Sequence, residues 1–295
     1  MERRTSADFS QDLLNLFDKY VHGDIDRRGF LERATKYAVG GMSASMILDL
    51  LSPRFAEAQQ ISKDDGRLKA STVEFSSPQG QGKMRGYLVR PAGATGKLPG
   101  VLVVHENRGL NPHIEDITRR IALEGFMAFA PDALTPLGGY PGDEDKAREL
   151  FAKLDPAKVR EDFVVAAGYL KSRPDCTEKI AVVGFCFGGG IANYLATRLP
   201  DLAAAVPFYG AQPKPEDVAK VKAPLLIHYA ENDERINAGV PAFEAALKTN
   251  HVKYHMFTYP GTQHGFNNDT TPRYDKAAAQ LAWQRTIDFL KKSLA

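Results

Sequence analysis

The feature that most constrains the fold is a run of apolar residues that leads into a cysteine framed by glycines, residues 182–190 (VVGFCFGGG). Valines favour a β-strand. Glycines two positions before and after Cys186 leave room for a sharp turn. Because each glycine inside a helix costs roughly 1 kcal/mol relative to alanine, three of them opening a helix indicate close packing. The run therefore predicts a strand, a strained turn at Cys186 and a helix whose N-terminus favours a thiolate there.

Strands and helices alternate along most of the chain. Two extended segments, 71–76 and 84–89, predict a leading hairpin. Further strands are predicted at 100–105, 126–130, 180–183, 204–209, 224–229 and 253–258. Helices are predicted at 113–123, 143–154, 157–172, 188–198, 242–248 and 274–291. Strands separated by helices require crossover connections, so we expect an α/β fold with a mostly parallel sheet covered by helices on both faces.

Composition excludes several classes of function. The chain has 38 basic and 36 acidic residues, a net charge of +2 and 43% hydrophobic residues. This balance gives no reason to expect a nucleic acid or an anionic membrane as partner. The sequence contains no stretch of about twenty uncharged apolar residues, so we do not expect a membrane span. With two cysteines a disulfide framework is excluded, and Cys176, which lacks a glycine frame, is interpreted as structural.

Two further residues follow predicted strands and complete a catalytic pattern. Asp233 comes after the strand 224–229, and His264 lies in a glycine-containing loop after the strand 253–258. The carboxyl ends of parallel strands meet at one edge of a sheet, which is where such sites are built. The order nucleophile, acid, histidine is that of the nucleophile-elbow hydrolases. Asp233 has an alternative role as a helix cap, and Glu231 is a rival acid.

The residue types assign the roles. His264 exchanges the proton of Cys186, Asp233 holds the imidazole tautomer, and the thiolate attacks an acyl carbon. We expect the oxyanion to be held by the backbone N–H groups of Phe187 and Asn107. Among the other histidines, His228 and His255 are expected to be packed within strands, and His22 and His251 are expected to be peripheral.

These residues resemble the dienelactone hydrolase family over residues 71–294. The resemblance is carried by the segments 184–189 (GFCFGG), 231–233 (END), 263–266 (QHGF) and 105–107 (HEN). It implies the α/β-hydrolase fold, hydrolysis of a lactone or ester, and no cofactor or metal. It also implies that Glu106 contacts the nucleophilic thiol. From the residues alone, Glu106 could instead be a solvated loop acid or hold a cation such as Arg108.

The chain departs from the family pattern in one place. The family has an arginine four residues after the catalytic histidine, where it helps to hold a substrate carboxylate, and here that position is Asn268. An amide cannot offer a charged fork. The departure puts dienelactone itself in doubt as the substrate. Arg108 and Tyr140 are candidate substitutes.

Residues 1–65 are predicted to form a helical extension or an export segment, ahead of a hydrolase domain at 66–295. The run 27–31 (RRGFL) resembles a twin-arginine signal, and 56–58 (AEA) resembles a cleavage site that would remove residues 1–58. This reading implies a periplasmic protein. The alternative is a cytoplasmic protein in which amphipathic helices at 8–20 and 42–51 form an arm that covers an apolar surface of the body or of a second subunit.

The sequence therefore predicts a hydrolase that cleaves a small ester or lactone through a cysteine nucleophile. The alternatives are a non-catalytic relative that binds a ligand or partner, and a redox thiol protein. The complete triad disfavours the first, and the lack of a well-placed resolving cysteine disfavours the second. We expect a small-molecule substrate, and a homodimer is an open alternative.

Overall fold

The computed structural model describes residues 4–38, 41–55 and 59–295. Its main feature is an eight-stranded sheet with the order β1-β2-β4-β3-β5-β6-β7-β8. The strands are β1 (Leu68–Ser77), β2 (Gly82–Pro91), β3 (Leu98–Val104), β4 (Met127–Pro131), β5 (Cys176–Phe185), β6 (Ala204–Phe208), β7 (Leu225–Asn232) and β8 (Tyr254–Gln263). The pairs β1–β2 and β2–β4 are antiparallel and all the others are parallel. The predicted hairpin and mostly parallel sheet are thus confirmed.

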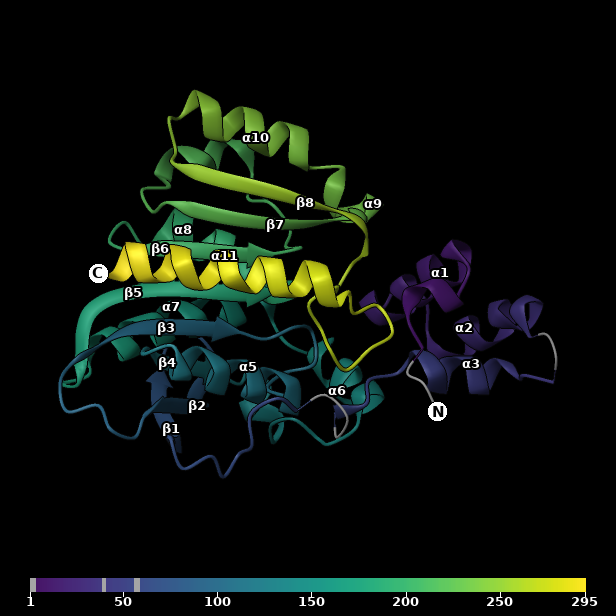
Figure 1. The fold of residues 1–295 in the computed structure, drawn as a ribbon, viewed down its shortest axis with the longest axis horizontal. Helices are drawn as coiled ribbons and strands as arrows, with labels where there is room; N and C mark the ends of the chain where they lie inside the picture. Colours follow the sequence, from purple (N-terminus) through teal and green to yellow (C-terminus); the bar gives the residue numbers. More distant parts are fainter. Residues whose placement is uncertain (1–3, 39–40, 56–58) are drawn as a thin grey trace.

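Helices cover both faces of the sheet (Figure 1). They are α5 (Pro112–Leu123), α6 (Glu144–Phe151), α7 (Pro156–Ser172), α8 (Phe187–Arg198), α9 (Glu234–Asn237), α10 (Val240–Thr249) and α11 (Lys276–Leu294). Short 3-10 turns lie at Thr135–Leu137 and Pro215–Lys220. Apolar residues of α7, α8 and α10 form one buried cluster with the sheet, and those of α5 and α11 form another. Both faces are therefore buried, as the continuous apolar strands require.

Three helices precede the sheet: α1 (Gln11–His22), α2 (Arg27–Ala34) and α3 (Ala44–Leu51), with 3-10 turns at Ser6–Asp8 and Thr35–Tyr37. Each helix begins at a serine or aspartate side chain that accepts a backbone N–H, which is the usual N-cap arrangement. The helices form a third apolar cluster whose members all lie within residues 9–51. The group stands beside the sheet, next to the end at which the parallel strands finish (Figure 1).

This arrangement corrects one of two alternative expectations. The arm does not cover an apolar surface of the body, because its large apolar side chains, such as Phe17 and Phe30, are buried against one another. Cover of a second subunit stays a prediction. Its contacts with the body include polar ones, such as the ion pair between Arg27 and Asp145. The predicted cleavage site at 56–58 lies outside the described residues. Within the described residues, no helix is both long enough and apolar enough to cross a membrane.

Candidate active site

Cys186 lies at the turn between β5 and α8, in the conformation that the glycine frame predicts. Its backbone has φ 55° and ψ −113°, a conformation that residues other than glycine rarely adopt. The glycines are needed there. A Cβ atom added to Gly184 would lie 1.9 Å from the carbonyl oxygen of Gly188, and one added to Gly188 would lie 2.2 Å from that of Val104. The strain at Cys186 is therefore held in place by close backbone packing on both sides.

Asp233 and His264 meet at the same edge of the sheet. His264 Nδ1 lies 2.5 Å from Asp233 Oδ2, and both residues are buried. The other carboxylate oxygen, Oδ1, accepts the backbone N–H of Ile236 and caps α9. The expected tautomer-holding role and the alternative capping role of Asp233 are thus compatible. The rival acid Glu231 is exposed and instead accepts the backbone N–H of Gly261 at 2.7 Å.

The electrostatics of the thiol favour its ionised form. Burial opposes ionisation, but the neighbouring imidazoles of His264 and His22 outweigh it and lower the pKa of Cys186 to about 6. Burial likewise disfavours the imidazolium form of His264, yet the negative charges of Cys186 and Asp233 raise its pKa to about 10. A thiolate beside an imidazolium is the reactive form of a cysteine nucleophile. Cys176, by contrast, is a buried residue of the sheet, and its burial raises the pKa of that thiol.

His22 was expected to be peripheral, and this expectation is wrong. The residue ends α1, and its Nε2 atom lies 3.4 Å from Cys186 Sγ. Its ring packs edge-on against that of His264, with ring centroids 4.8 Å apart. The sequence carries no signal that joins His22 to Cys186, because the two residues are 164 positions apart.

Loop residues after β3 complete this edge of the site. Glu106 accepts a hydrogen bond from Asn268 Nδ2 at 2.8 Å, so the position that replaces the family arginine still faces this carboxylate. Asn107 uses its side chain to hold the backbone oxygen of Val21 on α1, at 3.0 Å. Phe187 is the first residue of α8, where a backbone N–H has no acceptor within the helix. The contact of Glu106 with the thiol and the two oxyanion donors stay predictions.

The candidate substrate cation Arg108 is engaged elsewhere. Its Nε lies 3.7 Å from Glu144, and Nη2 donates to the backbone oxygen of Val21 at 3.1 Å. Tyr140 donates to the same Glu144 at 2.9 Å. Arg108 and Tyr140 therefore both contact the carboxylate of Glu144, so both side chains already have a partner within the protein.

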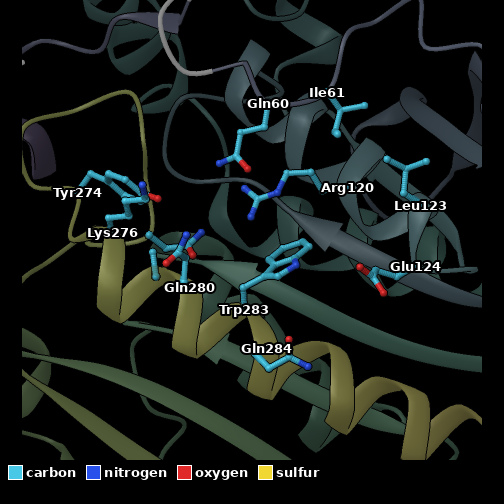
Figure 2. Close-up of a pocket in the computed structure, with 12 residues that line it drawn as sticks. Gln60, Ile61, Arg120, Leu123, Glu124, Tyr274, Lys276, Gln280, Trp283 and Gln284 are labelled. Atoms are coloured by element: carbon cyan, nitrogen blue, oxygen red, sulfur yellow. The ribbon is translucent and has the colours of Figure 1, made fainter.

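Two hollows lie near this part of the chain. One of about 440 Å³ is bounded by Asp233 and His264 on the body and by Asp18 and Lys19 on α1. A second, of about 500 Å³, lies between α5 and α11 and is drawn in Figure 2, where Arg120 and Trp283 line it. The second hollow is lined by none of the candidate catalytic residues, whereas Asp233 and His264 line the first, and Cys186 lines neither of the two.

Among the described residues, one group of histidine and cysteine side chains has the spacing of metal ligands: His22, Cys186 and His264, with ligand atoms within 4.8 Å of one another. The guanidinium of Arg235 lies 2.9 Å from His22 Nε2. A fixed positive charge at that distance opposes binding of a cation.

Comparison with known proteins identifies the fold and the family. The sheet with its strand–cysteine–helix turn defines an α/β-hydrolase fold. The family model described as "Dienelactone hydrolase family" matches residues 84–294, and a second, "YqhI-like", matches residues 1–39. The chain therefore belongs to the dienelactone hydrolase family, whose members are hydrolases.

Individual relatives support the assignment. A 115-residue stretch is 52% identical to the Escherichia coli K12 protein named "Putative hydrolase fragment YghX", and covers 39% of this chain and 98% of that one. A "Putative carboxymethylenebutenolidase" of Saccharolobus solfataricus is 34% identical over 71% of this chain and 94% of its own. The crystal structure titled "Putative Dienelactone Hydrolase" from Klebsiella pneumoniae superposes with a TM-score of 0.66 at 31% identity, over 76% of this chain and 99% of that one.

Proposed function

We propose that the protein hydrolyses small carboxylic esters or lactones through a thioester on Cys186. The observation that carries the proposal is the placement of this thiol on a strained turn at a helix N-terminus, beside the buried His264–Asp233 pair. The family membership gives the class of reaction. The relatives' name, carboxymethylenebutenolidase, suggests an enol-lactone as one candidate substrate.

The proposed reaction has two stages. The Cys186 thiolate attacks the carbonyl carbon, and the oxyanion accepts hydrogen bonds from backbone N–H groups, for which Phe187 and Asn107 are our candidates. As the carbon–oxygen bond breaks, the His264 imidazolium donates its proton to the leaving alkoxide. The neutral imidazole then takes a proton from water. The hydroxide formed attacks the thioester, which releases the acid and restores the thiolate.

The uncharged Asn268 refines the expected substrate. A substrate carboxylate would gain no charge-assisted contact at this position. The nearby Glu106 carboxylate, which Asn268 contacts, would repel an anion. We therefore propose that neutral esters and lactones are better substrates than those that carry a carboxylate.

The test is a hydrolysis screen with small aryl esters and lactones. Cys186→Ala should abolish turnover, and Cys176→Ala should retain most of it, because the second thiol is buried in the sheet away from the site. Circular dichroism confirms that both variants fold. Turnover that survives Cys186→Ala, or is lost equally in both folded variants, would overturn the assignment of the nucleophile.

A further inference from the structure

The α1 helix brings a second histidine to the thiol from the segment 1–39, which matches the YqhI-like model and lies outside the match to the dienelactone hydrolase family model. His22 Nε2 lies 3.4 Å from Cys186 Sγ, whereas the latter match begins at residue 84. The side chain of His22 is only 11% exposed, so the contact is shielded from solvent. The thiol therefore has two imidazole neighbours, those of His22 and His264, and the ligand atoms of the three side chains lie within 4.8 Å of one another.

Each imidazole has its own carboxylate. His264 is held by Asp233, and His22 Nδ1 lies 3.2 Å from Asp18, one turn earlier on α1. Asp18 is fixed in turn by Arg273, whose Nη1 lies 3.2 Å away. A carboxylate that holds one ring nitrogen directs proton exchange to the other, which is how the acid of a triad acts on its histidine. In His22 this other nitrogen, Nε2, also lies 2.9 Å from Arg235 Nη2. The same arrangement thus occurs twice around one sulfur atom.

The position of α1 is fixed by the body of the protein. The backbone oxygen of Val21, next to His22, accepts hydrogen bonds from the side chains of Asn107 and Arg108. At the other end of the helix, the amides of Gln11 and Gln263 exchange two hydrogen bonds, at 2.7 and 2.9 Å. Gln263 directly precedes His264. The contact between His22 and the thiol is therefore held from both ends of α1.

Several charges act on His22. Burial favours its neutral form, but the negative charges of Cys186 and Asp18 outweigh burial and raise the pKa of His22. The C-terminal end of α1 also favours the imidazolium. The guanidinium of Arg235, 2.9 Å from Nε2, and the imidazolium of His264 oppose it. The more distant charged groups on this side of the thiol are Glu106, Arg108 and Arg273.

We propose that His22 is a second catalytic histidine, which shares the proton of Cys186 with His264 and helps to stabilise the thiolate. Arg235, an exposed side chain that can only donate to Nε2, moves off this nitrogen as the proton passes from Sγ to Nε2. The step leaves a thiolate and an imidazolium, with no change in oxidation state. This inference rests on the proposed cysteine chemistry. If His22 has this role, the N-terminal helix α1 is part of the active site.

The test measures the ionisation of Cys186 without any substrate. Thiolate absorbance near 240 nm is followed against pH, with Cys186→Ala as the baseline for all other groups. His22→Gln keeps a polar side chain but cannot carry charge, and should raise the titration midpoint by about one pH unit, a tenfold change in the thiol–thiolate equilibrium. Asp18→Asn should raise it by less. Asp12→Asn, which removes an exposed carboxylate of the same helix, is the matched control and should leave it unchanged.

A midpoint that does not move in folded His22→Gln and Asp18→Asn proteins would overturn the proposal. Because Asp18→Asn retains His22, it tests the idea even where His22→Gln fails to fold. In turnover, His22→Gln should lower kcat about tenfold with little change in KM. A faster variant would show that His22 blocks the thiol, and would also overturn the proposal. Because the titration needs no substrate, its result is independent of whether esters are hydrolysed.

Discussion

Asp233→Asn should reduce turnover far more than Glu231→Gln, although the two acids are only two positions apart. Asp233 is 4% exposed and binds His264 Nδ1 at 2.5 Å. The hydrogen bond to this charged group is worth about 1.5–3 kcal/mol, or about 10- to 150-fold in rate. The amide can also donate to Nδ1 and hold the wrong imidazole tautomer, an error that costs about 10⁴-fold in serine proteases. We therefore expect kcat to fall by about 10²- to 10⁴-fold.

The matched variant Glu231→Gln changes an exposed side chain that can still accept the N–H of Gly261, so its kcat should stay within about twofold. The assay is kcat and KM for a neutral aryl ester against pH. Loss of the Asp233 charge removes one of the groups that raise the pKa of His264, so the alkaline limb of kcat should move to lower pH in Asp233→Asn. The choice of Asp233 as the catalytic acid would be refuted if Asp233→Asn changed kcat only slightly while Glu231→Gln lowered it strongly.

Three further predictions follow from the geometry of the site. The rate should rise as pH passes through about 6, where the Cys186 thiolate forms, and fall near pH 10, where the His264 imidazolium is lost; a profile without the acidic limb would contradict a buried thiol as the nucleophile. Gly188→Ala should lower the free energy of unfolding in urea by at least about 2 kcal/mol, because its Cβ would lie 2.2 Å from a backbone oxygen, whereas Gly190→Ala, with 3.6 Å available, should be nearly neutral. Asn268→Arg should raise kcat/KM for a carboxylate-bearing lactone relative to a neutral one by about 10-fold or more, and an unchanged ratio would show that this position does not contact the substrate carboxylate.

Local patterns predicted the body of the fold because local chemistry determines it. The turn at Cys186 needs its glycines for steric reasons that are visible in the sequence, and the buried strands are continuous apolar runs. The boundaries were less accurate. The strand predicted at 180–183 extends over Cys176–Phe185, and the one at 253–258 extends to Gln263. Both extensions include polar or charged residues that pair in the sheet without showing a strand pattern of their own.

The part of the site that could not be predicted depends on long-range docking. His22 and Asp18 share one face of α1, which their four-residue spacing implies. The spacing does not indicate which surface that face meets. The docking depends on side chains such as Asn107 and Gln263, which bind α1 through backbone and amide groups. Polar contacts of this kind carry no periodic signal, whereas apolar packing does.

The position of His22 also bears on the two interpretations of the N-terminal segment. Processing at residues 56–58 would remove α1, and with it His22 and Asp18. A processed chain would retain the Cys186, His264 and Asp233 arrangement, but its thiol would have one imidazole neighbour and would lose the cover that α1 provides. Arg27 already has a structural partner in Asp145, and the nearby Phe30 is fully buried, whereas Arg28 is exposed and pairs with Glu32 of the same helix. If His22 shares the proton of Cys186, cleavage at this place would reduce activity.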